Sequence, residues 1–458
     1  MSKIYESFYR NIKKYPNKIF VYNLKKKFSG KVCLLNLRKT EKFIKFNNIK
    51  SIGIKSINSF DWIILYLAAD KLCNKVFIIK SGTGLKTTNK LKKTHSIDYI
   101  INKIPKKIIK IKKRKSFDEI KEKRVDILFT SGTTAVPKGV IINENSFIHV
   151  VKILIKKFNH NRFDLEFLSM PFDHSFGLVR LRCCLYAGSK MLVNNGLVNF
   201  PDVYNFSKKI KITGLSLVPS GIELIKILLK KKIKEFNKNI KYFEIGSSNI
   251  NITTRKWLKK NFKTTNIIHH YGMTEASRSF LIDRGKKDNL KSSDNRIGNI
   301  INGCKYKISN NPNGELFLKG KNLFNGYLDI KENKKKFYKG WFKTGDIVKE
   351  EKKKLKIVGR IDNQINIGGN KVQAEFIENI VESIKFVYKC LCFQIKDKMF
   401  DKRIALQIEK KGKIKNKIVT DTIHKMLNNY PEYYKPKVIL FKKIKLNKNG
   451  KKIRIKFK

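Results

Sequence analysis

The sequence predicts an α/β fold with a large N-terminal domain of mixed and parallel sheets, a β-rich subdomain and a small α+β C-terminal domain. The first observation is that short apolar, strand-like runs alternate with helical segments through most of the chain. The second is a change near residue 302 to short alternating strands separated by turns, such as CKYKI, NPNG and ELFLKG. The third is that the segment after Gly359 contains strands and a helix of its own.

The individual elements follow from these patterns. Helices are predicted over residues 3–14, 36–46, 59–74, 205–211, 221–236, 253–261 and 420–429. Strands are predicted over residues 51–55, 76–79, 98–101, 125–129, 214–218, 241–245, 266–269, 388–395 and 403–408. We expect domains over residues 1–361 and 362–458, with the β-rich subdomain at about 302–358.

Composition restricts the class of protein. A hydrophobic content of 41% with 11% aromatic residues is typical of a globular chain. No segment approaches the roughly 20 apolar residues of a membrane span, and the start, MSKIYESFYRNIKKYP, has no signal-peptide core. Seven cysteines without the spacing of a disulfide framework favour a reducing compartment, so we expect a cytoplasmic protein without a membrane span.

The net charge of +66 comes from 102 Lys and Arg residues against 36 Asp and Glu residues. These cations are spread over the whole chain together with abundant Ile and Asn, which favours a general compositional bias over a nucleic-acid site. We therefore expect no specific nucleic-acid partner. The surface should still attract anionic partners, among which an acidic acyl-carrier protein is a candidate.

Residues 127–142 read ILFTSGTTAVPKGVII, with two apolar runs on either side of a segment rich in Thr, Ser and Gly. Such a segment can be a phosphate-binding loop, because small residues expose backbone N–H groups and a lysine adds a positive charge. It is not a Walker A loop, since Pro137 and Gly139 replace its second glycine and its Ser or Thr, and a strand follows. A Thr-rich hairpin loop without a ligand is the alternative interpretation.

Seven further motifs follow this segment in order. They are Pro171–Gly177, Tyr271–Glu275, Gly314–Leu316, Gly326–Tyr327, Gly340–Asp346, Gly359–Ile365 and Asn449–Arg454. Together with the Thr-rich segment they resemble the acyl- and aminoacyl-adenylating superfamily: acyl-CoA synthetases, luciferases and the adenylation domains of peptide synthetases. The resemblance extends from about residue 5 to the C-terminus and is closest in pattern to acyl-CoA synthetases.

The resemblance implies ATP-dependent activation of a small carboxylic acid to an acyl-adenylate. The acyl group then passes to the thiol of coenzyme A or of a carrier phosphopantetheine, with release of AMP and pyrophosphate. Mg²⁺ is implied as the metal, and the small C-terminal domain as a mobile lid that rotates about Asp362. Catalysis of this kind depends on positioning and charge stabilisation, as in phosphoryl transfer generally.

The resemblance also implies the residues that bind ATP. The phosphates are assigned to Thr130, Ser131, Gly132, Thr133, Thr134 and Lys138, with Ala135 departing from the usual glycine. In the motif YGMTE, Tyr271 and Gly272 are implied at the adenine, Thr274 near the α-phosphate, and Glu275 as the Mg²⁺ ligand, for which a hard carboxylate is suited. The resemblance further places Asp346 at the ribose hydroxyls and Arg360 at the ribose or phosphate. Lys451 is implied as the catalytic cation, with Glu275, Thr134 and His174 as further catalytic residues, and Lys452 remains an alternative to Lys451.

The substrate pocket is assigned by the same resemblance to Asp173, His174, Gly246, Ser247 and Met273. Its specificity stays open at this point. The segment PFDHSFG resembles the acyl-CoA ligases, which favours a plain acid. The same segment fits the Phe-Asp-x-Ser pattern of amino-acid adenylation domains, in which the aspartate pairs with an α-amino group. That alternative is a D-alanine-ligase-like enzyme that loads a carrier protein. A further alternative, of another class, is an inactive adenylating scaffold that acts as a basic binding protein.

Overall fold

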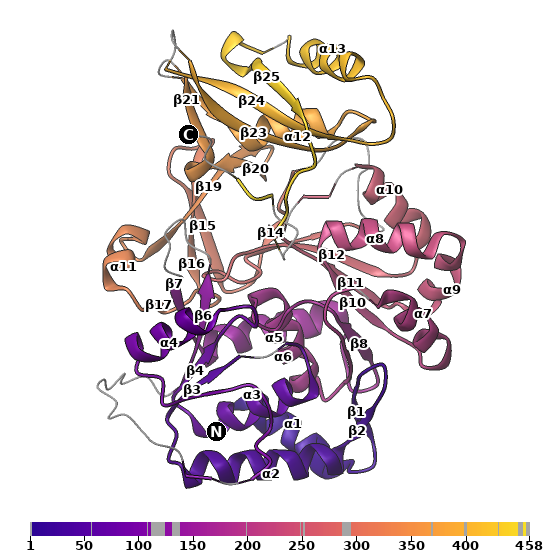
Figure 1. Cartoon of the computed structure of the whole chain (residues 1–458), viewed down its shortest axis with the longest axis vertical. Coiled ribbons are helices and arrows are strands. Elements are labelled where there is room, and N and C mark those ends of the chain that lie inside the picture. Colours follow the sequence, from indigo (N-terminus) through magenta and orange to yellow (C-terminus); the bar gives the residue numbers. More distant parts are fainter. Residues whose placement is uncertain are drawn as a thin grey trace.

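The computed structural model describes residues 2–55, 57–107, 109–110, 124–130, 138–197, 199–247, 249–250, 252–285, 295–367, 370–397, 401–428, 430–447 and 452–454. Figure 1 shows the N-terminal half of the chain at the bottom, the β-rich sheet above it on one side, and the C-terminal segment at the top. Among the described residues, no helix combines the length and the apolar character needed to cross a membrane.

The largest sheet has a parallel centre and antiparallel edges. Its strands, in spatial order, are β14 (Asn299–Ile300), β13 (Phe280–Asp283), β12 (Asn266–Tyr271), β11 (Tyr242–Ile245), β10 (Gly214–Leu217), β8 (Leu165–Leu168), β9 (Lys190–Val193), β1 (Ile19–Tyr22) and β2 (Lys27–Ser29). The strands from β12 to β1 are parallel to one another, and β14, β13 and β2 are antiparallel to their neighbours.

A second sheet contains the predicted phosphate segment. Its strands, in spatial order, are β17 (Gly326–Tyr327), β7 (Lys138–Asn143), β6 (Val125–Thr130), β4 (Lys75–Ile78), β3 (Ser51–Ile54) and β5 (Tyr99–Ile101). Strands β3 to β6 are parallel, as the α/β prediction requires, whereas β6 and β7 form an antiparallel hairpin and β17 pairs with the outer edge of β7.

Helices fill the space between and around these sheets. They are α1 (Lys3–Lys14), α2 (Gly30–Phe46), α3 (Phe60–Leu72), α4 (Leu85–Thr94), α5 (Glu144–Phe158), α6 (Ser175–Ala187), α7 (Phe200–Lys209), α8 (Pro219–Leu229), α9 (Ile233–Phe236) and α10 (Ile252–Asn261). The central helices α3 and α6 are buried on all sides. A helix that is apolar all round requires partners on every face, and the main core joins α3 to strands of both sheets.

The β-rich sheet and the C-terminal segment follow. The β-rich sheet is antiparallel and contains β15 (Cys304–Ile308), β16 (Asn313–Gly320), β19 (Trp341–Glu351), β18 (Phe337–Tyr338) and β20 (Lys354–Arg360), with α11 (Ile330–Lys336) beside it. The C-terminal segment contains β21 (Gln364–Ile367), β22 (Asn370–Gln373), α12 (Ala374–Glu382), β23 (Val387–Asp397), β24 (Asp401–Lys410), α13 (Asn416–Leu427) and β25 (Pro436–Phe441). These last elements pack around a core of their own.

The structure confirms the α/β class, and it corrects several predicted elements. The single helix predicted over 221–236 is interrupted after α8, because Lys230 adopts a left-handed backbone conformation with φ 42°. The helix predicted over 205–211 is α7, which begins five residues earlier, at Phe200. The helix predicted over 36–46 begins at Gly30, where the Ser29 side chain accepts a hydrogen bond from the backbone of Val32.

Candidate active site

The Thr-rich segment joins the two strands of a hairpin. Thr130 ends β6 and lies opposite Lys138, the first residue of β7, and the Thr130 hydroxyl donates to the Lys138 carbonyl at 3.5 Å. The predicted phosphate residues Ser131, Gly132, Thr133 and Thr134 lie outside the described residues, as does Ala135. Thr130 and Lys138 are therefore paired at the loop end of the hairpin.

The ammonium group of Lys138 has a carboxylate partner that the sequence analysis did not identify. Its Nζ lies 2.5 Å from Oε2 of Glu332 on α11, and both side chains are partly exposed. The hydrogen bond from Lys138 lowers the pKa of Glu332. Lys138 is thus held at the junction of the hairpin and the β-rich region, with its charge already paired.

A second group joins the end of β12 to the β-rich sheet. The Tyr271 hydroxyl donates to Oδ2 of Asp346 at 2.5 Å, and the Arg360 guanidinium binds the other oxygen, Oδ1, at 2.5 Å. Burial and the Asp346 charge raise the pKa of Tyr271, so the phenol keeps its proton and acts as the donor. Strands β19 and β20 pair Asp346 directly with Arg360. Three residues predicted at the nucleoside therefore meet in one hydrogen-bonded cluster.

The residues after Tyr271 form a tight turn. The backbone of Met273 and that of Ala276 exchange two hydrogen bonds, of 3.1 and 3.2 Å. A Cβ atom on Gly272 would lie 2.4 Å from the backbone nitrogen of Arg278, so the turn requires glycine there. Thr274 and Glu275 are half-buried in this turn. The Glu275 carboxylate accepts a hydrogen bond of 2.9 Å from the Tyr327 hydroxyl.

Asp173 and His174 lie in the turn before α6, and His174 is the N-cap residue. The Asp173 Oδ2 atom accepts a hydrogen bond from the backbone amide of Ser81 at 3.1 Å, and its Oδ1 atom lies 3.7 Å from Nε2 of His174. The turn itself is fixed by Asn58, which binds the backbone of both Met170 and Phe172. The aspartate carboxylate therefore connects this turn to the loop after β4.

Gly246 and Ser247 follow β11, next to the end of β12. A Cβ atom on Gly246 would lie 2.2 Å from the imidazole of His270, so the ring lies directly against the glycine. Gly246 is buried, whereas Ser247 is exposed and has φ 82°. The His270 ring also contacts the Phe176 ring edge to face at 4.8 Å, so residues from β11, β12 and α6 meet here.

His269 and His270 lie in β12, which extends to Tyr271, two residues beyond the predicted strand, and His270 has a carboxylate partner. Its Nδ1 atom lies 2.7 Å from Oε1 of Glu244, which also accepts from Arg278 at 3.0 Å. Burial and Arg278 lower the pKa of His270, which favours the neutral ring. The histidine is therefore part of a buried polar network beneath Gly246.

The C-terminal candidates are placed only in part. Asp362 lies in a short 3₁₀ turn between β20 and β21, and its side chain is 54% exposed. Lys451 lies outside the described residues. Lys452 is described, and its Nζ atom is 2.7 Å from Glu378 and 2.6 Å from Glu382. The ammonium group of Lys452 is therefore paired with carboxylates of the C-terminal segment.

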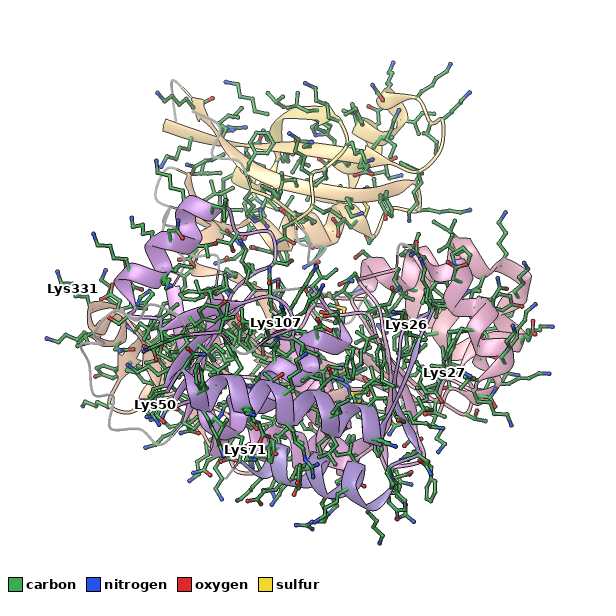
Figure 2. All side chains as sticks on the ribbon, turned by 60° about the horizontal axis from the view of Figure 1, so that its bottom comes forward. Lys26, Lys27, Lys50, Lys71, Lys107 and Lys331 are labelled. Carbon is green, nitrogen blue, oxygen red and sulfur yellow. The ribbon has the colours of Figure 1, made fainter. Side chains whose placement is uncertain are left out.

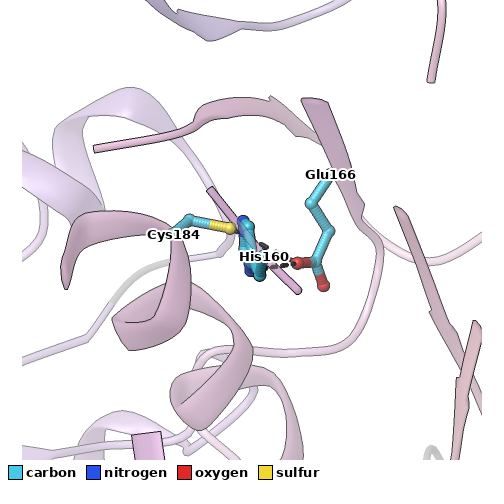
Figure 3. Close-up of side chains that lie close together, drawn as sticks. All are labelled: His160, Glu166 and Cys184. Atoms are coloured by element: carbon cyan, nitrogen blue, oxygen red, sulfur yellow. Dashed lines mark hydrogen bonds and ion pairs between the residues drawn. The ribbon is translucent and has the colours of Figure 1, made fainter. Parts of the chain in front are cut away.

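One group of potential metal ligands lies away from these residues, at His160, Glu166 and Cys184 (Figure 3). Their ligand atoms are within 4.8 Å of one another and are buried. The Glu166 carboxylate, however, already accepts two hydrogen bonds from Arg180 and one from Tyr242. Burial and Glu166 raise the pKa of Cys184, which keeps it a thiol instead of the thiolate that metals bind. This group is a structural ion-pair cluster between α6 and the central strands.

Glu332 and Tyr327 bind predicted site residues through their side chains and were not predicted as site residues themselves. Tyr327 belongs to the motif Gly326–Tyr327, for which the sequence alone indicated no role. Glu332 follows that motif by five residues, but nothing local indicates that its partner is Lys138, which lies 194 positions earlier. For both residues, the sequence signal was that they lie in or shortly after the motif Gly326–Tyr327.

The chain is similar in sequence to several known proteins. A family model described as AMP-binding enzyme matches residues 49–328. The acyl-CoA synthetase ALT10 of Alternaria alternata is 25% identical over 425 residues, which cover 84% of this chain and 73% of that protein. A D-alanine–D-alanyl carrier protein ligase of Bacillus licheniformis is 23% identical over 345 residues, which cover 71% of this chain and 68% of the ligase.

The fold has a similar counterpart among solved structures. The o-succinylbenzoate CoA synthetase of Bacillus subtilis, in complex with its acyl-adenylate intermediate, aligns with a TM-score of 0.80 at 16% identity. The alignment covers 98% of this chain and 96% of that chain. Because the family model spans more than half of the sequence, the chain belongs to the AMP-binding enzyme family and is an adenylate-forming acid–thiol ligase.

Proposed function

We propose that this ligase activates a carboxylic acid without an α-amino group and transfers the acyl group to coenzyme A or to a carrier phosphopantetheine. One observation carries the choice of acid. The Asp173 carboxylate is bound by the Ser81 amide and lies beside His174. An aspartate that recognises a substrate ammonium must direct its charge at the ligand, whereas here the carboxylate connects two loops. His174, Gly246, Ser247 and Met273 are the remaining proposed pocket residues.

The nucleoside of ATP is assigned to the cluster at the end of β12. The Tyr271 ring is proposed to lie against the adenine beside Gly272, and Asp346 to accept hydrogen bonds from the ribose hydroxyls. The Arg360 guanidinium compensates the negative charge of Asp346 and is available to the ribose or phosphate. Support comes from the hydrogen bonds that already orient the Asp346 carboxylate from both sides.

The phosphates are assigned to the hairpin and to the turn after β12. Thr130, Ser131, Gly132, Thr133, Thr134 and Lys138 are proposed around the leaving pyrophosphate, and Thr274 near the α-phosphate. Glu275 fits a Mg²⁺ ion, because it offers a hard carboxylate that is half-buried and oriented by Tyr327. Mg²⁺ supplies charge neutralisation on the phosphate oxygens when it is bound.

The reaction then needs little covalent chemistry from the protein. An oxygen of the substrate carboxylate forms a bond to the α-phosphorus of ATP while the bond to pyrophosphate breaks, which gives the acyl-adenylate. A thiolate sulfur next forms a bond to the acyl carbon, and AMP leaves with the electron pair of its bond to that carbon. The protein residues position the groups and stabilise the developing charge.

Lys451 is the proposed catalytic cation for the first step. Its neighbour Lys452 was the alternative, but two carboxylates, Glu378 and Glu382, bind that ammonium. Moving Lys452 into the active site would break both ion pairs and leave Glu378 with Arg454 alone, which favours Lys451. Asp362 is proposed as the hinge of the C-terminal lid, in line with its exposed position between β20 and β21.

Pyrophosphate release with MgATP tests this proposal directly. A panel of fatty acids, aromatic acids, short hydroxy acids and amino acids should give release with one class of plain acid. Lys451→Ala should lose this release, and Lys445→Ala is the matched control, because Lys445 is an exposed lysine of the same segment. Equal release by Lys451→Ala and the wild-type chain would overturn the role of Lys451.

Amino-acid activation is the second candidate, favoured by the similarity to the D-alanine–D-alanyl carrier protein ligase. Amino-acid activation and plain-acid activation predict different effects of Asp173→Ala. If Asp173 binds an ammonium group, the variant should lose release with amino acids selectively. If Asp173 only connects the two loops, the variant should lower thermal stability and leave the preference among acids unchanged.

The high positive charge offers a candidate of another class, a scaffold without turnover that binds anionic partners. Figure 2 shows labelled lysines on separate elements: Lys26 before β2 and Lys27 at its start, Lys71 on α3 and Lys331 on α11. This distribution favours a general attraction for anions, including an acidic carrier protein, over one nucleic-acid groove. Salt-dependent retention on DNA without pyrophosphate release would favour the scaffold instead.

The seven cysteines all lie within the described residues, and all are free thiols. Six of them are buried. This state supports the proposal that the enzyme works in a reducing compartment, as expected for a cytoplasmic protein.

A further inference from the structure

The motif Gly326–Tyr327 forms β17, a two-residue strand on the outer edge of the phosphate hairpin. Tyr327 is 5% exposed, and its hydroxyl donates to Oε1 of Glu275 at 2.9 Å. Tyr327 is therefore the one described side chain for which a hydrogen bond to the Glu275 carboxylate is seen. The contact joins the second sheet to the turn after β12.

The backbone of Tyr327 is held on both sides. Its register with β7 places it opposite Val140. On the other side, the Asn333 side chain accepts from the Tyr327 amide at 2.7 Å and donates to its carbonyl at 3.0 Å. The ring packs edge to face on Phe324 at a centroid distance of 4.8 Å. These contacts fix the position of the phenol oxygen.

The backbone of Glu275 is connected to the same region. Its carbonyl accepts a hydrogen bond from the Phe324 amide at 2.9 Å, and the next residue, Ala276, bridges Leu323. Tyr327 and Glu275 are therefore both held by contacts with Phe324. Without a donor, a carboxylate rotates about its last side-chain bond, and a fixed hydroxyl removes that freedom.

The phenol is suited to act as a donor. A phenol hydroxyl has one proton to donate, and its oxygen lies 2.9 Å from Oε1 of Glu275, the distance of a normal hydrogen bond. The Glu275 oxygen that faces Tyr327 is Oε1. Among the described residues, no hydrogen bond to the other oxygen, Oε2, is seen.

We propose that Tyr327 is a positioning residue for the metal site: its hydroxyl holds Oε1 of Glu275 so that Oε2 is directed at the metal ion of MgATP. This inference rests on the proposed role of Glu275 as the metal ligand. It gives the motif Gly326–Tyr327 a function, because the short strand and Asn333 serve to place one hydroxyl group. Carboxylate ligands of metal ions are commonly oriented by such a hydrogen bond.

The test uses the full chain and Mn²⁺ as the probe. Binding is followed by the electron paramagnetic resonance signal of free Mn²⁺, with a non-hydrolysable ATP analogue at saturation. Tyr327→Phe keeps the ring and its packing on Phe324 and removes only the hydroxyl. The expected result is about tenfold weaker Mn²⁺ binding, the usual effect of losing a group that orients a metal ligand.

The matched control is Tyr306→Phe. The Tyr306 hydroxyl also donates to a carboxylate of the β-rich sheet, that of Glu350 at 3.2 Å. This control should bind Mn²⁺ like the wild-type chain, and thermal melting of both variants shows whether the fold is kept.

A third variant, Glu275→Gln, separates the two levels of the inference. If Glu275→Gln weakens Mn²⁺ binding and Tyr327→Phe does not, the positioning role of Tyr327 is overturned while the proposed metal ligand stands. If neither variant changes Mn²⁺ binding, Glu275 is not the metal ligand, and the role of Tyr327 falls with it.

Discussion

Replacing Glu332 by glutamine should strengthen ATP binding. The Lys138 ammonium is paired with the Glu332 carboxylate at 2.5 Å, so a phosphate group that recruits Lys138 must first replace this partner. Breaking the ion pair costs free energy, and this cost makes the binding of ATP weaker. Glu332→Gln removes the competing charge and keeps the size of the side chain.

The size of the effect follows from the exposure of the pair. The Lys138 and Glu332 side chains are 24% and 16% exposed, which places the pair near the surface. Pairs of this kind contribute about 0.2–1 kcal/mol, so the KM for ATP should fall by about 1.4- to 5-fold. The pKa of Glu332 is lowered by Lys138, so the carboxylate is charged at neutral pH. Salt should reduce the difference between the variant and the wild-type chain.

The assay is the KM for ATP in pyrophosphate release, measured at two salt concentrations. Glu351→Gln is the matched control, since Glu351 forms an ion pair of 2.5 Å with Lys356 elsewhere on the β-rich sheet. This control should leave the KM unchanged. A KM that rises in Glu332→Gln would refute the competition argument and would mean that Glu332 holds Lys138 in its productive position. An unchanged KM would mean that Lys138 does not contact the phosphates.

Two further predictions concern histidines. Gly246→Ala places a Cβ atom 2.2 Å from the His270 ring. The kcat/KM for the acid should therefore fall at least about tenfold, with little change in the KM for ATP. Gly84→Ala is the control, because its Cβ atom would have no atom within 4 Å; if Gly246→Ala is as active as the wild-type chain, the acid binds elsewhere. Burial lowers the pKa of His160 to about 4. Because the unfolded chain takes up this proton near pH 6.5 and the buried ring takes it up only at lower pH, the free energy of unfolding should fall as the pH is lowered from about 6.5 to 4. Urea unfolding of His160→Asn should show a shallower pH dependence over this range, and an equal slope would contradict the assignment.

Elements with a strong local pattern could be predicted from the sequence. Helix α3 was expected over 59–74 and spans Phe60–Leu72, because its uninterrupted apolar run suits a helix buried on every face. Helix α6 was missed for the opposite reason. Its Arg180 and Arg182 side chains interrupt the apolar pattern, and both are buried because Glu166 and Asp126 on distant strands pair with them. Such compensation is invisible in the local sequence.

In the candidate site, too, features with a local sequence signal could be predicted, and features that depend on distant partners could not. The order of the motifs predicted that Tyr271, Asp346 and Arg360 lie close together. In the structure, hydrogen bonds join the three side chains. The orientation of Asp173 could not be predicted, because its partner is the backbone amide of Ser81, which every residue type offers. The break at Lys230 was also missed, since a left-handed lysine within a run of lysines carries no glycine signal.

The pairing of β17 with β7 has a consequence for biosynthesis. The hairpin of β6 and β7 is translated long before Tyr327, so the outer edge of β7 has no strand partner while the intervening chain is being made. An unpaired edge of this kind is a template for association with other chains. The nascent protein therefore pairs the outer edge of β7 late, and a ribosome-bound chain that stops before residue 326 should be prone to aggregation.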